Sequence, residues 1–196
     1  KTIIKEIPKE LQTLFFSATM PKDIRVLADS ILRNPVSVTV APQASTTDQV
    51  QQRRYIVDKT MKRQLLLHLL DNDVNTQVLI LTRTKRGADR LAKDITNAVI
   101  AVASLQEDKS QNARQKALHA FRNIAAQGID ITELPFVINF DLPDSPETYV
   151  HRIGRTGRAQ FTGEALTLLT PDQEKDMRAI EKLIQQRVTI VHDHPF

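Results

Sequence analysis

The feature that most constrains the fold is an alternation of short apolar runs with amphipathic helical patterns over residues 49–185. The runs expected to form strands are 53–57, 77–82, 99–103, 136–140 and 165–170. The helical patterns cover 60–70, 85–96, 110–121, 145–153 and 172–185. Continuous apolar strands separated by helices are typical of a parallel sheet covered on both faces. The alternation therefore predicts an α/β domain built on a parallel β-sheet.

The first 41 residues have a different organisation. Residues 12–16 and 36–40 are expected to form short strands, and the apolar residues between them have helical spacing. Because a two-stranded sheet is marginal in water, these elements need a partner sheet. We interpret residues 1–41 as the end of a preceding domain and residues 42–48, rich in Ser, Thr and Gln, as a linker.

The composition excludes several classes of protein. The chain of 196 residues is 41% hydrophobic and 26% charged, which is ordinary for a globular protein. It has no run of 18 apolar residues and no signal-peptide pattern, so we expect a cytoplasmic location without membrane contact. The absence of cysteine excludes disulfides and thiolate catalysis. The net charge of +4 permits a polyanionic partner.

A cationic segment punctuated by glycines runs from His151 to Ala159, with the sequence His-Arg-Ile-Gly-Arg-Thr-Gly-Arg-Ala. Just upstream, Ser145 is a suitable N-cap and Pro146 suits the first helical position. The pattern predicts a helix that begins there and ends near Gly154. The rest of the segment is then expected to form a loop.

Arg155 and Arg158 are the candidate functional residues of this loop. Gly154 and Gly157 can adopt a positive φ and allow close approach to a ligand. Guanidinium groups pair bidentately with phosphate oxygens and stay charged, which suits the charge that develops on a transferring phosphoryl group. The alternative is a solvated basic loop with surface ion pairs.

Residues 151–158 resemble motif VI of the DEAD-box RNA helicases, which has the form His-Arg-Ile-Gly-Arg-Thr-Gly-Arg. In that family the motif lies on the second of two RecA-like domains and faces the ATP held by the first. The resemblance implies that Arg155 and Arg158 are arginine fingers that also contact the nucleotide. It further implies that His151 links the ATP site to the RNA site.

Ser17, Ala18 and Thr19 resemble motif III, Ser-Ala-Thr, which closes the first RecA-like domain of the family. The resemblance implies that these three residues, together with Arg152, couple the two domains. The alternative is a strand end that happens to carry two hydroxyl groups.

Two further segments suggest contacts with a nucleic-acid backbone. Thr82, Arg83 and Lys85 follow a predicted strand and precede a helix start, where the helix adds positive potential. They resemble motif IV. Gln111 and Arg114 resemble the Gln-x-x-Arg of motif IVa and could contact phosphates. Solvated polar residues at two helix starts are the alternative for both segments.

Residues 124–130 resemble the second half of motif V, which implies that Asp130 binds the ATP ribose and that Gly128 belongs to the same nucleotide site. Gln127 replaces the arginine that is usual in the family. A further departure is that only two residues separate Phe121 from Ile124, where the family has a turn, a core strand and a Thr-Asp pair. Losing that strand is expected to leave two neighbouring strands unpaired.

We interpret this shortening in one of two ways. Either residues were deleted from the protein by engineering, or the protein contains further residues at this point that the continuous numbering passes over. A second departure lies at Leu105, Gln106 and Glu107, where the family usually has a His-Gly ahead of an acidic residue and Gln-x-x-Arg.

The resemblance as a whole implies the second RecA-like domain of an ATP-dependent RNA helicase, with RNA, ATP and the first domain as partners. The chain has no Gly-x-x-x-x-Gly-Lys-Ser/Thr loop and no Asp-Glu-Ala-Asp, so the first domain would hold ATP and Mg²⁺. The chain alone is expected to be inactive. Two alternatives stay open, a RecA-like module that binds nucleic acid without catalysis and a related helicase that acts on DNA.

The carboxyl end, residues 186–196, is interpreted as an extension containing one more strand and a polar tail. His192 and His194 could suggest a metal ion, but a solvated tail without metal is the favoured interpretation.

Overall fold

The computed structural model describes residues 11–17, 20, 22–38, 49–72, 77–125, 134–157 and 162–196, with the backbone alone for 122–125. The chain divides into two compact units, Lys1–Pro42 and Gln43–Phe196.

The first unit contains one described helix, α2, at Lys22–Ile31, where a helix is predicted. The described residues at 12–16 and 36–38 form no strand, so the two strands predicted there are absent from this part of the structure. Phe16 and Val36 are 87% and 90% exposed. The physical reason is the lack of a neighbouring strand, without which extended backbone has no ladder to join.

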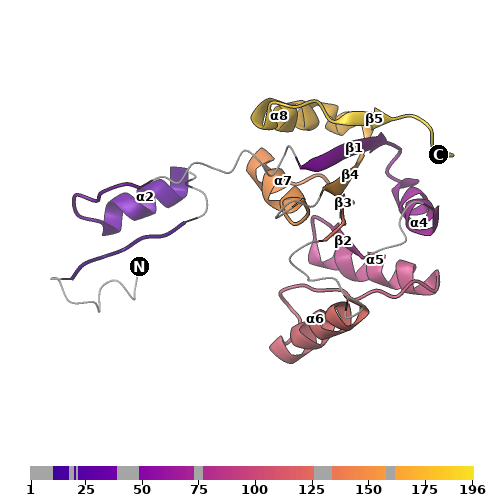
Figure 1. The fold of residues 1–196 in the computed structure, drawn as a ribbon, viewed down its shortest axis with the longest axis horizontal. Coiled ribbons are helices and arrows are strands. Elements are labelled where there is room, and N and C mark those ends of the chain that lie inside the picture. The colour runs from indigo at the N-terminus through magenta and orange to yellow at the C-terminus, as the bar shows by residue number, and fades with distance from the viewer. Residues whose placement is uncertain are drawn as a thin grey trace. The chain divides into compact units, whose positions relative to one another are not determined.

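The second unit is a five-stranded sheet with the order β2-β3-β4-β1-β5, in which every pair is parallel (Figure 1). The strands are β1 at Val50–Ile56, β2 at Val78–Leu81, β3 at Phe136–Asn139, β4 at Gly163–Leu169 and β5 at Thr189–Val191. The helices are α4 at Lys62–Asn72, α5 at Lys85–Asn97, α6 at Gln111–Ala125, α7 at Pro146–Ile153 and α8 at Glu174–Ile184, preceded by a 3-10 turn, η1, at Pro171–Gln173. The predicted parallel α/β architecture is confirmed. None of the helices in the described ranges is long and apolar enough to cross a bilayer.

Two hydrophobic clusters cover the two faces of the sheet. Residues along β4 point alternately to one face and the other, so they belong to different clusters. Leu166 and Leu168 pack with α4 and α5 in one cluster, whereas Ala165 and Leu169 pack with α7 and α8 in the other. Figure 1 accordingly shows α4 and α7 on opposite sides of the strands. Each fully buried leucine contributes about 1.5–3 kcal/mol. The second cluster thereby fixes α7, the helix that carries the cationic segment.

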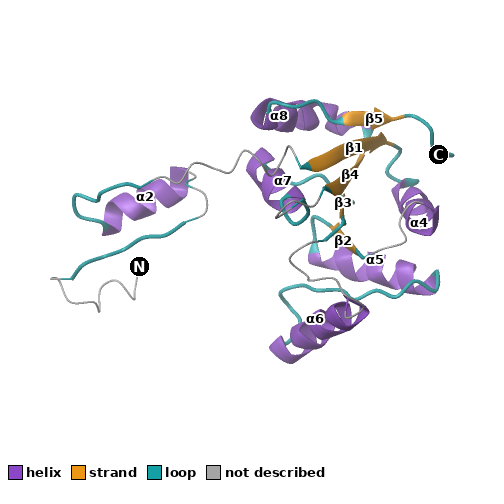
Figure 2. Ribbon diagram, in the orientation of Figure 1, coloured by secondary structure: helices purple, strands orange, loops and turns teal. Residues whose placement is uncertain are grey.

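The strand predicted at residues 99–103 does not form. After α5 ends, Val99 takes a positive φ of 63° and is 94% exposed. Its backbone N–H donates to Thr96 O at 2.9 Å, which closes the helix instead of starting a strand. Residues 100–106 then form a loop between α5 and α6 (Figure 2).

The shortened segment before Ile124 does not leave two strands unpaired, so that expectation is wrong. β2 and β3 pair directly, with Val78 opposite Phe136 and Leu81 opposite Asn139. The β2–β3 ladder is therefore continuous. Helix α6, however, is poorly packed, since none of its described side chains is buried and Leu118 is 39% exposed.

The sheet continues past residue 185, and β5 is the further strand predicted within residues 186–196. It forms the edge of the sheet and aligns Thr189 with Arg53 of β1. The tail is also not simply solvated, because the ring of His194 lies edge-on to Tyr55 with centroids 5.9 Å apart. Aromatic packing against the domain accounts for this difference.

Candidate functional site

Helix α7 begins as the sequence predicts. Ser145 is its N-cap, with its side chain accepting from Thr148 N at 3.2 Å, and Pro146 occupies the first turn. Tyr149 and Ile153 are fully buried and attach the helix to the sheet. Burial raises the pKa of Tyr149 to about 12, and its hydroxyl donates to Gln52 Oε1 at 3.0 Å. The helix is therefore a rigid support for the residues that follow it.

Arg152 connects the end of α7 to the carboxyl ends of two strands. Its Nη1 donates to Asp141 O at 2.9 Å, and its Nη2 donates to Thr82 O at 3.3 Å. Burial lowers the pKa of the half-buried guanidinium, and Asp141 counteracts that effect. Arg152 thus holds the helix in place in this structure.

The loop after α7 is packed against the starts of neighbouring strands. Thr156 donates to Leu134 O and, at 3.2 Å, to Pro135 O, just before β3. Gly157 has a φ of +64°, and a Cβ there would lie 2.6 Å from Val50 Cγ2. Gly154, in contrast, has a φ of −67°, so the positive φ expected there is wrong. Its N–H still closes the helix by donating to Val150 O.

Arg155 and His151 are exposed next to this fixed framework. The backbone N–H of Arg155 donates to Arg152 O at 3.1 Å, which sets its position on the turn. Within the described part of the chain, the Arg155 guanidinium has no hydrogen bond or ion pair. Arg155 is thus positioned by its backbone and available through its side chain. Arg158 lies outside the described residues.

Thr82 and Arg83 lie at the carboxyl end of β2, where the sequence places them, and both are engaged. The Thr82 hydroxyl donates to Thr84 O at 3.1 Å. The Arg83 Nη2 donates to Leu142 O at 3.1 Å, and its Nε lies 3.3 Å from the Asp144 carboxylate. Both side chains are therefore occupied by the protein itself.

Lys85 begins α5 and is paired with two carboxylates, Glu107 at 3.0 Å and Asp108 at 2.8 Å. Gln111 and Arg114, at the start of α6, are exposed, and their side chains have no partner among the described residues. The structure thus separates two engaged cations, Arg83 and Lys85, from one free cation, Arg114. The sequence pattern does not distinguish them.

The comparisons with known proteins decide the family. A family model described as the helicase conserved C-terminal domain matches residues 61–160, about half of the chain. This chain belongs to that helicase family. The chain is 35% identical over 198 residues to the DEAD-box ATP-dependent RNA helicase RhpA of Helicobacter pylori and 37% identical to CshA of Bacillus subtilis. Each alignment covers 96% of this chain and 40% of the relative, so the chain spans about two fifths of their length.

Solved structures agree with this result. The helicase domain matches Saccharomyces cerevisiae Dbp5 bound to RNA and ADP BeF3 with a TM-score of 0.80 and 27% identity, over 96% of this chain and 53% of that one. A DEAD box protein from Methanococcus jannaschii matches with a TM-score of 0.67 and 29% identity, over 96% and 53%. The chain is a DEAD-box helicase C-terminal domain with a RecA-like fold.

Several residues expected at the site cannot be placed. Ala18, Thr19, Gly128 and Asp130 lie outside the described residues of the helicase domain and its preceding unit. Ser17 is described and exposed.

Sequence reasoning missed Lys62, the first residue of α4. Its side chain is buried, and its three N–H groups donate to Leu168 O at 2.8 Å, Phe140 O at 3.2 Å and Gln173 Oε1 at 3.5 Å. It thereby binds the carboxyl ends of β3 and β4 together. A signal was present, because Lys62 begins an apolar stripe that continues at Leu65, Leu66 and Leu69.

We expect Lys62→Met to lower the free energy of unfolding by about 1–3 kcal/mol, because two strand-end carbonyls lose their donor. Burial lowers the pKa of Lys62 from 10.5. Between the lowered pKa and 10.5 the unfolded chain binds more protons, so wild-type stability gains with rising pH there. Urea unfolding at neutral and alkaline pH should show a wild-type advantage that grows with pH.

Lys182→Met, at an exposed position on α8, is the matched control and should show neither effect. If the stability advantage of the wild type over Lys62→Met became smaller as the pH rises, the proposed role of Lys62 would be contradicted.

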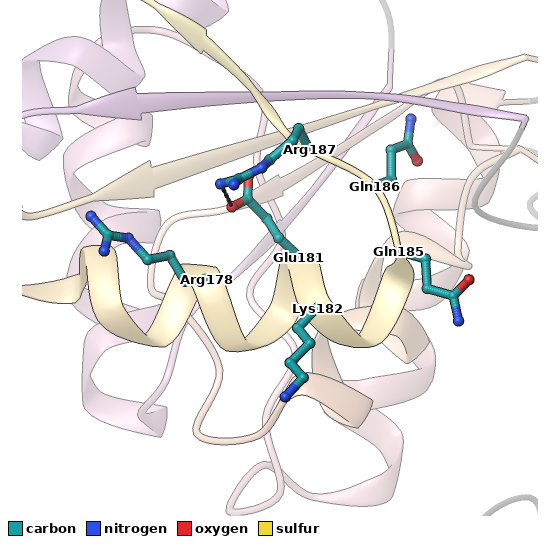
Figure 3. A pocket seen from close by; sticks show the side chains of 6 residues that line it. All are labelled: Arg178, Glu181, Lys182, Gln185, Gln186 and Arg187. Atoms are coloured by element: carbon teal, nitrogen blue, oxygen red, sulfur yellow. Dashed lines mark hydrogen bonds and ion pairs between the residues drawn. The ribbon is translucent and has the colours of Figure 1, made fainter.

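A shallow pocket on α8 contains none of the predicted site residues. It is lined by Arg178, Glu181, Lys182, Gln185, Gln186 and Arg187 (Figure 3). The Glu181 carboxylate accepts from Arg187 Nη1 at 3.1 Å and from Val188 N at 2.9 Å. Arg178 and Lys182 point to different sides of the helix in Figure 3. These cations do not converge on one ligand, so the pocket is not the site.

Proposed function

We propose that this domain is the second RecA-like domain of an ATP-dependent RNA helicase, in which it supplies arginine fingers to ATP and part of the RNA path. A first RecA-like domain would hold ATP and Mg²⁺, and a cytoplasmic location, where ATP and RNA are available, belongs to the same proposal. The observation that carries it is the contrast between Arg152 and Arg155. Arg152 is used to fix α7, whereas Arg155 is exposed without a described partner three residues later.

The fit to ATP rests on the chemistry of Arg155. A planar fork of N–H donors suits phosphate oxygens, and it is mounted here on a buried helix and a tightly packed turn. ATP, when bound, supplies the phosphoryl group to be transferred. The residues of this chain orient Arg155 and provide positive charge, with Arg158 and Asp130 assigned to the nucleotide and His151 to coupling on the resemblance.

The RNA assignment concerns Thr82, Arg83, Lys85, Gln111 and Arg114. They lie at the starts of α5 and α6 or just before them, where hydroxyl, amide and cationic groups suit sugar and phosphate. Such contacts carry no direct base readout. RNA binding by this domain is therefore expected to tolerate any sequence and to weaken with salt.

Arg114→Gln is expected to weaken binding of a single-stranded RNA and to reduce the log–log salt slope by roughly one unit, because one phosphate contact is lost. Fluorescence anisotropy of a labelled oligouridine at several salt concentrations measures both quantities. Arg178→Gln, which removes an exposed arginine from α8, is the control and should leave the slope unchanged. A strong preference for one base sequence would count against the backbone contacts.

We also expect this chain alone to show no RNA-stimulated ATPase above background, because it contains neither the phosphate loop nor the Asp-Glu-Ala-Asp sequence. A phosphate-release assay on the purified chain, with and without RNA, provides the measurement. Turnover that disappears in Arg155→Ala would contradict the assignment of the nucleotide to another domain.

A further inference from the structure

The loop that joins α5 to α6 is fixed to α5 through Asp89. Ser104 Oγ donates to Asp89 Oδ1 at 2.6 Å, and Gln106 Nε2 donates to Asp89 Oδ2 at 3.0 Å. Lys109 Nζ lies 3.6 Å from the same carboxylate and donates to Ser104 O at 2.8 Å. The hydrogen bond from Ser104, followed by that from Gln106, lowers the pKa of Asp89. The loop therefore has a defined position relative to α5.

That position brings two carboxylates to Lys85. Gln106 Oε1 accepts from Asp108 N at 2.7 Å and so orients the acidic turn. Asp108 Oδ1 then lies 2.8 Å and Glu107 Oε2 3.0 Å from Lys85 Nζ. The two hydrogen bonds raise the pKa of Lys85. Lys85 is thus neutralised from within the domain.

The start of α5 is otherwise a strongly positive location. Thr84 caps the helix, Lys85 and Arg86 occupy its first two positions, and the first turn contains no acidic residue. The unpaired N–H groups of the helix start add to this positive potential. Glu107 and Asp108 provide the missing negative charge from the neighbouring loop. A phosphate group would provide the same charge at the same ammonium group.

The acidic turn also lies between two parts of the proposed RNA surface. Lys85 precedes it on α5, and Gln111 and Arg114 follow it on α6. The Glu107 side chain is 83% exposed and that of Asp108 is 69% exposed, so both can move away from Lys85.

We infer that Glu107 and Asp108 are internal competitors of RNA phosphate for Lys85 and thereby set a low RNA affinity for this domain. The inference rests on the proposed RNA contact of Lys85 and adds the residues that regulate it. Because both ion pairs lie at the surface, RNA can displace both carboxylates, and removing them strengthens binding about three- to tenfold.

The experiment compares binding of a labelled oligouridine to the wild-type chain and to Glu107→Gln/Asp108→Asn. We expect about three- to tenfold tighter binding and a salt slope larger by roughly one unit, since Lys85 then neutralises a phosphate without first losing a carboxylate. Lys85→Gln should weaken binding less in the wild-type background than in the Glu107→Gln/Asp108→Asn background. It should abolish the gain in the Glu107→Gln/Asp108→Asn background.

Asp71→Asn/Asp94→Asn is the matched control, because it removes two carboxylates from α4 and α5 away from Lys85; Asp94 pairs with Arg63. An equal gain in this control would attribute the effect to net charge and overturn the inference. Unchanged affinity in Glu107→Gln/Asp108→Asn, with binding still sensitive to Arg114→Gln, would overturn the inference alone. Absence of RNA binding in every variant would overturn the proposed RNA contacts and the inference with them.

Discussion

Arg155→Lys is expected to lower the kcat of ATP hydrolysis by the full-length helicase about 10³–10⁵-fold. This corresponds to about 4–7 kcal/mol of transition-state stabilisation at 1.36 kcal/mol per factor of ten. Lysine keeps the positive charge and loses the planar fork, so the change tests the geometry of the finger. Steady-state ATPase assays with saturating RNA provide the measurement, and Arg158→Lys has the same expected result.

The melting temperature should stay near the parent value, because the Arg155 side chain has no described partner to lose. Arg178→Lys, at an exposed position on α8, is the matched control and should leave kcat unchanged. A surface ion pair contributes only about 0–1 kcal/mol, so the two interpretations of Arg155 differ widely in magnitude. ATPase within a few-fold of the parent, together with weaker RNA binding, would assign Arg155 to RNA instead.

Gly163→Ala is expected to destabilise the domain more than any surface change, by about 1–3 kcal/mol or more, because β4 starts directly against the turn after α7. A Cβ at residue 163 would overlap Thr156 Oγ1 and lie 2.6 Å from the Gly157 backbone N. The Gly157 backbone N is held between β1 and β4, so it cannot move aside unless the turn after α7 moves with it. Differential scanning calorimetry should show a lower melting temperature.

The same substitution should also reduce the ATPase of the full-length enzyme, because the turn that carries Arg155 shifts. Gly87→Ala is the comparison variant, since its Cβ would meet side-chain atoms and no backbone, with Thr84 Oγ1 at 2.9 Å and Thr82 Cβ at 3.9 Å, within a helix that favours alanine. A melting temperature for Gly163→Ala equal to that of the parent would show that the turn is not fixed by this packing.

Local chemistry made the helices predictable from the sequence. Ser145 and Pro146 mark the start of α7, and the capping box of Thr170 and Gln173 marks the start of the last helical segment. In both cases the groups that stabilise the helix end lie within a few residues of it. The failed strands at 12–16 and 99–103 had suitable apolar sequences. Their formation depends on a partner strand, which no local pattern encodes.

The site was predictable to a similar degree. The motifs identify Arg155, Lys85 and Arg114 as candidates, because residue types and spacing are part of the sequence. The sequence does not show whether these side chains are free to bind a ligand, because the pairing of Lys85 with Glu107 and Asp108 depends on how Asp89 fixes a distant loop. Lys62 was missed because a lysine in an apolar stripe is rarely buried, and its three acceptors come from other elements.

The interior place of β1 in the sheet affects how the domain can form during synthesis. β1 lies between β4 and β5, and its side chains meet partners far along the chain, with 111 residues between Arg53 and Glu164 and 134 between Gln52 and Gln186. At about 5–20 residues per second, a ribosome needs roughly 5–30 s to deliver those partners. Until then both edges of β1 are unpaired and open to pairing with other chains. A nascent chain arrested before β4 should therefore be protease-sensitive and a substrate for chaperones.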